Sequence, residues 1–110
     1  MCRWTPPDVF KGFGRILHGG IQSGLFDEIM GWTAMHLSEK FGVTANLQVR
    51  FLKPVLVEQE IEVRCRIDSR DGERINLSAE IKNPQGVVCT TAQGTYMLLD
   101  GDRFNELVSE

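Results

Sequence analysis

A histidine, two glycines and an aspartate close together in the sequence could polarise and attack an acyl carbonyl. The segment reads His18-Gly19-Gly20, and Asp27 follows nine positions after the histidine. If a helix begins at the glycine pair, its first N–H groups lack intrahelical partners and lie at the positive end of the helix dipole. Because glycine has no side chain, a substrate carbonyl can approach those donors closely. The pattern predicts an oxyanion hole, although a sharp turn alone would also explain two glycines.

Asp27 is expected two turns into that helix, among mostly apolar residues. An ionised carboxylate in such surroundings is costly unless it is paired or hydrogen-bonded, and carboxylates of this kind serve as bases or nucleophiles. A favourable acidic group near the helix N-terminus, or an exposed polar edge, is the structural alternative. Glu28 points about 100° away around the helix and is expected to face solvent. His18 is expected to hold the turn by hydrogen bonds or to contact a substrate.

The elements that would position these groups are one helix and four strands. Residues 21 to about 40 carry two apolar stripes, which predict a helix covered on most of its circumference and capped by Gly42. Tight turns at 71–72 and 83–86 predict antiparallel neighbours. We therefore predict an α+β fold, in which a curved antiparallel sheet wraps around one long central helix. Alternating apolar and polar residues predict the strands, at about 44–51, 61–67, 75–81 and 87–99.

The first of these strands has a clear alternation. It assigns Ala45, Leu47 and Val49 to the buried face and Thr44 to the polar face. In the last run both alternations contain apolar residues, so its inward face is not determined by the sequence.

Composition is that of an ordinary globular domain. The chain has 110 residues, 42% hydrophobic and 25% charged, and a net charge of −3 without a basic cluster, which argues against a nucleic-acid partner. Three cysteines and two histidines at scattered positions favour neither a disulfide framework nor a metal site. No apolar run is long enough to span a membrane, and no signal peptide is evident. We expect a cytoplasmic protein without a metal or cofactor.

The segment 14–32 resembles the signature of the hotdog-fold acyl-CoA thioesterases of the PaaI type. These relatives carry His-Gly-Gly and an acidic residue nine positions after the histidine, as at His18 and Asp27. The similarity continues through an aromatic-x-x-Pro turn at 51–54 and on to about residue 100. It implies one hotdog domain, which we expect to occupy residues 1–110. Composition predicts an irregular segment at about 1–11, in which residues 1–4 could be the end of a strand, and a polar tail at 101–110.

The resemblance also implies a reaction, the hydrolysis of an acyl-CoA thioester without a separate cofactor. The Gly19 N–H would polarise the carbonyl, and Asp27 would act as general base on water or as nucleophile. Thr44 would help to hold the water, and His18 would order the loop. In relatives the site lies between two subunits, which implies a homodimer, often paired into a homotetramer. The candidate substrate contacts are Gly12, Gly20, Ile21, Ser23, Phe26 and Met30.

One departure from these relatives keeps a second function open. They often carry Asn or Gln six or seven residues before the histidine, where this chain has Gly12 and Lys11. A non-catalytic module that binds acyl-CoA or another acyl thioester would fit that departure. A hotdog hydratase is disfavoured, because those enzymes use an Asp and His pair close in sequence that this chain lacks. The identity of the acyl group is not determined by the sequence.

Overall fold

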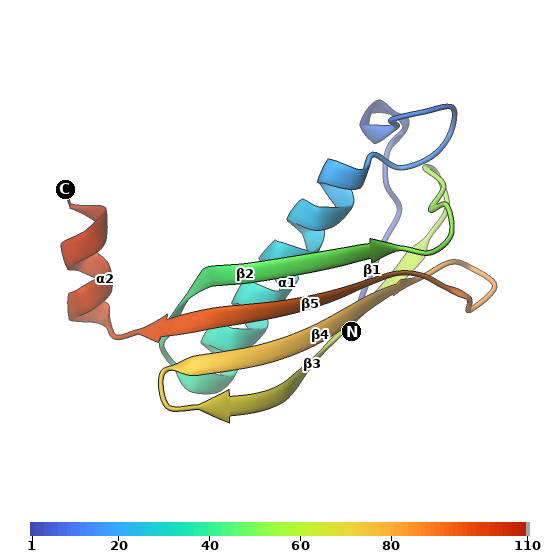
Figure 1. The fold of residues 1–110 in the computed structure, drawn as a ribbon. Coiled ribbons are helices and arrows are strands. Elements are labelled where there is room, and N and C mark those ends of the chain that lie inside the picture. The colour runs from blue at the N-terminus through green and yellow to red at the C-terminus, as the bar shows by residue number, and fades with distance from the viewer. Residues whose placement is uncertain (110) are drawn as a thin grey trace.

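In the computed structural model, which describes residues 1–109 apart from the side chains at positions 104 and 107, one long helix packs against a five-stranded antiparallel sheet (Figure 1). The helix α1 spans Gly19–Ser38. A 3-10 turn, η1 (Asp8–Phe10), precedes it, and a short helix, α2 (Gly101–Val108), ends the described chain. The predicted hotdog fold is confirmed. The strands are β1 (Cys2–Trp4), β2 (Phe41–Phe51), β3 (Ile61–Asp71), β4 (Arg74–Lys82) and β5 (Val88–Leu99).

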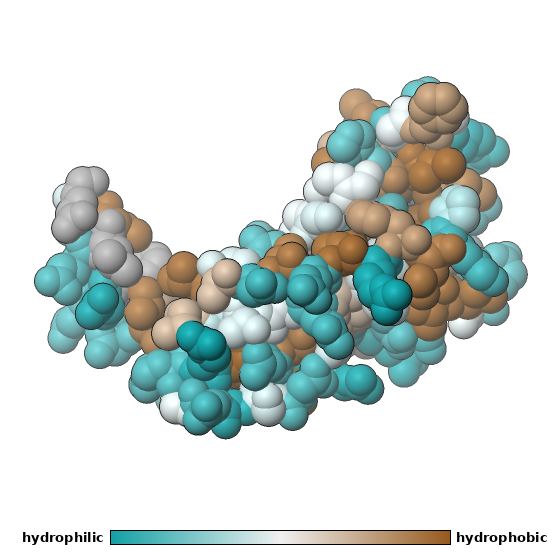
Figure 2. Space-filling model, in the orientation of Figure 1, coloured by the Kyte–Doolittle hydropathy of each residue, from teal (hydrophilic) through white to brown (hydrophobic). Residues whose placement is uncertain are grey.

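The sheet has the strand order β1-β3-β4-β5-β2, and its neighbouring strands are antiparallel. Tight turns join β3 to β4 and β4 to β5. Gly72 and Gly86 lie in these turns with φ of 61° and 79°, a conformation that favours glycine. Strand β2 lies at an edge, because within residues 1–109 it pairs with β5 as its only strand neighbour. Figure 2 shows a broad hollow on the β2 side of the molecule, between α2 and the loops that precede α1.

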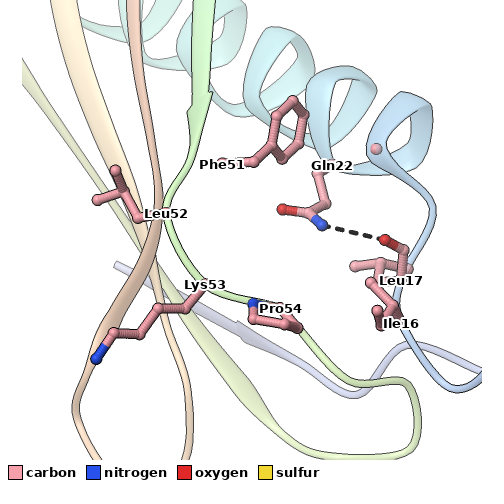
Figure 3. A pocket seen from close by; sticks show the side chains of 8 residues that line it. Ile16, Leu17, Gln22, Phe51, Leu52, Lys53 and Pro54 are labelled. Carbon is pink, nitrogen blue, oxygen red and sulfur yellow. Dashed lines mark hydrogen bonds between the residues drawn. The ribbon is translucent and has the colours of Figure 1, made fainter.

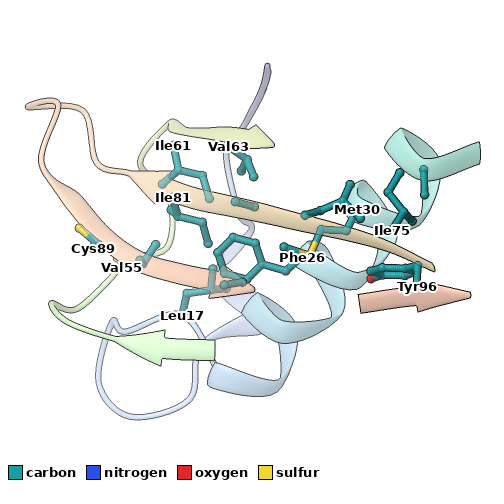
Figure 4. Close-up of a cluster of buried hydrophobic side chains, with 14 of the residues drawn as sticks. Leu17, Phe26, Met30, Val55, Ile61, Val63, Ile75, Ile81, Cys89 and Tyr96 are labelled. Carbon is teal, nitrogen blue, oxygen red and sulfur yellow. The ribbon is translucent and has the colours of Figure 1, made fainter. Parts of the chain in front are cut away.

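The core lies between α1 and the inward face of the sheet (Figure 4). Phe26, Met30 and Ala34 recur at intervals of four on α1, and none has exposed surface. The other predicted stripe consists of Ile21, Leu25, Ile29 and Trp32. Its first three residues are only half-buried in the single chain, and Trp32 is 60% exposed. One chain therefore buries the stripe of α1 from Phe26 to Ala34, leaves Leu37 at its end 61% exposed, and leaves much of the opposite side open. Buried partners of α1 on the sheet include Ile61, Val63, Ile75, Leu77, Ile81, Tyr96 and Leu98.

The C-terminal end of α1 differs from the prediction. The helix stops at Ser38, and Glu39 takes the left-handed conformation (φ 59°) while its N–H donates to the Met35 carbonyl. The prediction of Gly42 as the cap is wrong, because this residue lies within β2. A Cβ added there would lie 3.3 Å from the Ala34 Cβ, so the glycine lets β2 approach α1 closely.

Both ends of the described chain contain more regular structure than predicted. The segment 1–11, expected to be irregular apart from a strand end within residues 1–4, contains both β1 and η1. The segment expected to be a polar tail forms α2, because the Asp100 carboxylate accepts a hydrogen bond from the Arg103 N–H at 2.8 Å and caps the helix. Position 110 of that tail lies outside the described residues. None of the helices within residues 1–109 is long and apolar enough to span a lipid bilayer.

A buried polar bridge fastens the loop before α1 to the sheet. Gln22 is 3% exposed, and its Nε2 donates to the Leu17 carbonyl at 3.1 Å. Its Oε1 accepts from the hydroxyl of Thr90, a fully buried residue of β5, at 2.6 Å. The Leu17 N–H donates to the Val55 carbonyl at 2.7 Å. The residue directly before His18 is thus held from two sides.

Replacing Thr90 by Val should destabilise the protein, because the Gln22 Oε1 would be left buried without a donor. An unsatisfied buried acceptor of this kind costs about 1–3 kcal/mol. Thr90→Ser keeps the hydroxyl and loses one methyl, a change of about 0.8 kcal/mol. Urea unfolding of the three proteins measures both changes. A Thr90→Val protein more stable than Thr90→Ser would show that the bridge does not contribute as described.

Candidate active site

Asp27 is half-buried on the side of α1 that faces the start of β2. Its Oδ1 accepts two hydrogen bonds of 2.6 Å each, one from the Thr44 hydroxyl on β2 and one from the Tyr96 hydroxyl on β5. The Tyr96 hydroxyl also lies 3.2 Å from the Asp27 carbonyl oxygen. No hydrogen bond within residues 1–109 reaches the Asp27 Oδ2. Two neutral donors therefore fix one carboxylate oxygen and leave the other available to water or a substrate.

A β-bulge in β2 turns Thr44 toward the helix. Thr44 pairs with Tyr96, whereas Asn46 pairs with Thr95, so Ala45 is the extra residue between the two pairs. Residues that pair directly share a face of the sheet, and Thr44 therefore faces α1 beside Tyr96. The predicted assignment of Thr44 to the polar face is wrong, because the bulge shifts the alternation by one residue.

Tyr96 is a site residue that the sequence analysis missed. Its side chain is buried, and a Cβ added at Gly31, Gly42 or Gly94 would lie 3.8, 3.7 or 2.9 Å from its ring. Three glycines, from α1, β2 and β5, thus form the slot through which the ring reaches Asp27. The signal available in the sequence was the spacing of Gly94 and Tyr96, which places both on the same face of one strand and leaves room for the tyrosine ring beside the glycine. Burial, and then the adjacent carboxylate, raise the pKa of Tyr96, so the phenol is a donor at neutral pH.

The other half of the predicted site is the N-terminus of α1. His18 caps the helix, because its Nδ1 accepts a hydrogen bond from the Gly20 N–H at 2.9 Å. That bond occupies one of the two predicted oxyanion donors. The Gly19 N–H precedes the first intrahelical hydrogen bond and has no acceptor within residues 1–109. The structure therefore leaves Gly19, rather than the glycine pair, to bind an anionic oxygen.

A cavity of about 400 Å³ opens beside Gly19 (Figure 3). A Cβ added at Gly19 would lie 3.3 Å from the Phe51 Cζ, so the aromatic ring at the end of β2 packs against the Gly19 backbone. The residue that carries the free N–H donor of α1 therefore lies at the wall of a cavity. The residues that line it are Ile16, Leu17, Gly19, Gln22, Phe51, Leu52, Lys53 and Pro54.

The remaining predicted contacts lie at different depths. Gly12 packs against the capping histidine, since a Cβ there would lie 3.3 Å from the Cα of that residue. Ile21 and Ser23 are half-buried on the first turns of α1. Phe26 and Met30 are core residues without exposed surface. A role in substrate binding for any of them stays a prediction.

Within one chain, the two halves of the site are too far apart to act on one carbonyl. Gly19 and Asp27 both belong to α1, and the eight-residue interval between them corresponds to about 12 Å along the helix axis. A reacting carbonyl group needs the attacking group and the oxyanion donor each about 3 Å away. The geometry of one chain alone does not meet that requirement.

Tyr96 should limit stability in alkaline solution. Its pKa in the folded protein lies above the ordinary value of 10. Below pH 10 the phenol is therefore protonated in both the folded and the unfolded chain, and it contributes no pH dependence to the free energy of unfolding. Above that pH, the unfolded chain loses the proton first, and stability falls as pH rises. Tyr96→Phe should remove this part of the fall, as measured by denaturant unfolding between about pH 8 and about pH 11. Because Tyr96 is the only tyrosine, phenolate absorbance titrates it directly; an ordinary midpoint near 10 would contradict the prediction.

Comparisons with known proteins agree with this architecture. The family model of the Thioesterase superfamily matches residues 14–90. The acyl-coenzyme A thioesterase THEM4 of Bos taurus is 22% identical over 104 residues, which cover 94% of this chain and 42% of that protein. Verlamelin biosynthesis protein B of Lecanicillium sp is 25% identical over 116 residues, which cover 79% of this chain and 50% of that protein. The chain thus spans half the length of these curated relatives or less.

Among solved structures, an acyl-CoA hydrolase of Staphylococcus aureus superposes with a TM-score of 0.87 at 18% identity, covering 93% of this chain and 66% of that one. Thioesterase superfamily member 2 of Mus musculus superposes with a TM-score of 0.80 at 20% identity, covering 87% of this chain and 77% of that one. At these identities the superpositions show the fold. The family match covers more than half of the chain, and this protein therefore belongs to the Thioesterase superfamily.

Proposed function

We propose that this protein hydrolyses an acyl-CoA thioester, with Asp27 as the reacting carboxylate and the Gly19 N–H as the oxyanion donor. The observation that carries the proposal is the state of Asp27: two hydroxyls hold its Oδ1, and its Oδ2 has no partner within residues 1–109. Membership of the Thioesterase superfamily supports the same chemistry. So do the name of the bovine relative and the butyryl coenzyme A bound to the Staphylococcus aureus hydrolase.

The proposed reaction uses the free oxygen of Asp27. As base, Oδ2 takes a proton from water while the water oxygen bonds to the carbonyl carbon and the carbonyl electrons move to its oxygen. The Gly19 N–H stabilises that negative oxygen. The C–S bond then breaks, and the thiolate takes the proton from Asp27. As nucleophile, Oδ2 bonds to the carbonyl carbon, expels the thiolate, and the resulting anhydride is hydrolysed by water.

Two copies of the chain complete the site in this proposal. Phe51, at the end of β2, packs against Gly19, whereas Thr44, nearer its start, contacts Asp27. Strand β2 has an open edge over residues 43–51 within the described chain, and a two-fold axis would pair two such edges antiparallel. That pairing sets the Thr44 end of one strand opposite the Phe51 end of its partner. Asp27 of each copy then approaches Gly19 of the partner subunit.

We assign the chain to the PaaI type within the superfamily, on the spacing from His18 to Asp27 and the turn at 51–54. It departs from that type before the histidine, where Lys11 forms an ion pair with Asp8 at 3.3 Å instead of offering an amide. This departure favours a second candidate function, a module that binds acyl-CoA without hydrolysing it. A homotetramer and a cytoplasmic location stay predictions.

Asp27→Asn should lower kcat for thiol release by about 100-fold or more, because the amide has nearly the same shape but cannot accept the proton. Acyl-CoA binding should change little. A chromogenic disulfide measures the thiol, and calorimetry measures the binding. Unchanged kcat in the variant would remove the proposed mechanism. Binding by the wild-type protein without any thiol release would establish the binding module instead.

Mixing two inactive variants should restore activity if the site is shared between subunits. Gly19→Pro removes the N–H donor but suits the first position of a helix, and Gly19→Ala is its control, since it adds a Cβ near Phe51 and keeps the donor. After subunit exchange with Asp27→Asn, half of the dimers are mixed and each holds one intact site, which gives about a quarter of wild-type activity. Mass spectrometry confirms the exchange. Mixed dimers without activity would mean that both groups act from one chain.

A further inference from the structure

We propose that the cavity beside Gly19 binds the acyl group of the substrate, and that Phe51 and Ile16 determine the length of acyl chain it accepts. The inference rests on the proposed thioester chemistry and adds the location and class of the acyl group to it. The class is an unbranched or aromatic apolar acyl group, short enough to end within about 400 Å³.

The position of Gly19 connects the cavity to the reacting carbonyl. Gly19 lines the cavity, and its N–H is the donor that would hold the carbonyl oxygen. A thioester carbonyl has two substituents, the acyl chain and the thiol of the carrier. With the oxygen at the Gly19 N–H, one of these substituents lies at the mouth of the cavity, and the other points away from it.

The lining of the cavity selects the acyl chain over the carrier. Most of its side chains are apolar, and Phe51 and Ile16 are 55% and 37% exposed, so an apolar ligand would remove their surface from water. The Gln22 amide uses its Nε2 and its Oε1 in the buried bridge, and Figure 3 shows the Lys53 side chain directed away from Gln22. The amide groups of a pantetheine arm would lose water here without gaining partners.

The inner wall of the cavity is packed core, which limits how far an acyl group can extend in that direction. Leu17 and Gln22 line it and are 1% and 3% exposed, so the packed core begins directly behind them. Figure 3 shows Phe51 and Gln22 near one end of this space, with Pro54 and Ile16 nearer its other end. An acyl chain that extends inward beyond this wall would have to displace one of these side chains.

Other spaces in the chain are less suited to an acyl group. Phe26 and Met30 are in close contact within the core and have no exposed surface. A second cavity, of about 910 Å³, is lined by Arg50, Arg64 and Glu80 among other polar residues of the sheet. An apolar chain bound there would cover charged groups without providing partners for them.

Two substitutions with opposite effects test the inference. Phe51→Ala enlarges the cavity, and the chain length with the highest kcat/KM should increase. Ile16→Trp fills it, and kcat/KM for the longest accepted acyl-CoA should fall about tenfold or more relative to acetyl-CoA. The measurement is thiol release from acetyl-, butyryl-, octanoyl- and palmitoyl-CoA. Circular dichroism and size-exclusion chromatography verify that each variant keeps its fold and assembly.

Phe13→Ala is the matched control for Phe51→Ala. Phe13 is 88% exposed and does not line the cavity, so the same truncation should leave the chain-length profile unchanged. Inhibition by free CoA should be equal in all variants. An unaltered chain-length profile in Phe51→Ala and Ile16→Trp would overturn the inference. An equal loss of affinity for free CoA and for every acyl-CoA would also overturn it, because that result would assign the cavity to the CoA carrier.

The proposed function and this inference can fail separately. If the wild-type protein releases no thiol from any acyl-CoA, hydrolysis is excluded, and the same variants are compared by calorimetric dissociation constants for the acyl-CoA series. A length-dependent change of affinity in the two cavity variants, absent in Phe13→Ala, would still support the acyl site. Affinities that are independent of chain length in every variant would overturn it.

Discussion

Two short hydrogen bonds to one oxygen of Asp27 hold together the three elements that form the site. They join α1 to β2 through Thr44 and to β5 through Tyr96. Both donors are neutral hydroxyls, and no Lys or Arg within residues 1–109 forms an ion pair with this carboxylate. The charge of Asp27 is therefore oriented without being neutralised, which is the state that a base or nucleophile requires.

Strand β5 is the common support of both halves of the site. Tyr96 fixes the carboxylate, and six residues earlier Thr90 fixes the loop before α1 through Gln22. Both side chains point from β5 toward the helix, so one strand holds α1 near the Gly19 donor and again at Asp27. In a dimer, each shared site would use Asp27 of one subunit and the Gly19 donor of the other. Each of these groups would be held in place by strand β5 of its own subunit.

The sequence was sufficient for the fold and for the proposal that Asp27 and Gly19 are the two reacting groups. Periodicity predicted α1 and four of the strands, because each has one face that must be buried, and the turn glycines marked the hairpins. Local pattern could not reveal Tyr96, since its partners come from three elements distant in sequence. It also assigned two donors to the glycine pair, because it could not show that the His18 ring occupies the Gly20 N–H.

The bulge at Ala45 has a consequence for how relatives of this chain are compared. Thr44 faces α1 only because one extra residue separates it from the regular part of β2. Deleting that residue would leave the amino-acid types of the strand nearly unchanged while rotating the hydroxyl to the opposite side of the sheet. Two homologues that differ by a single insertion or deletion here can therefore align well and still differ in whether a hydroxyl faces the carboxylate.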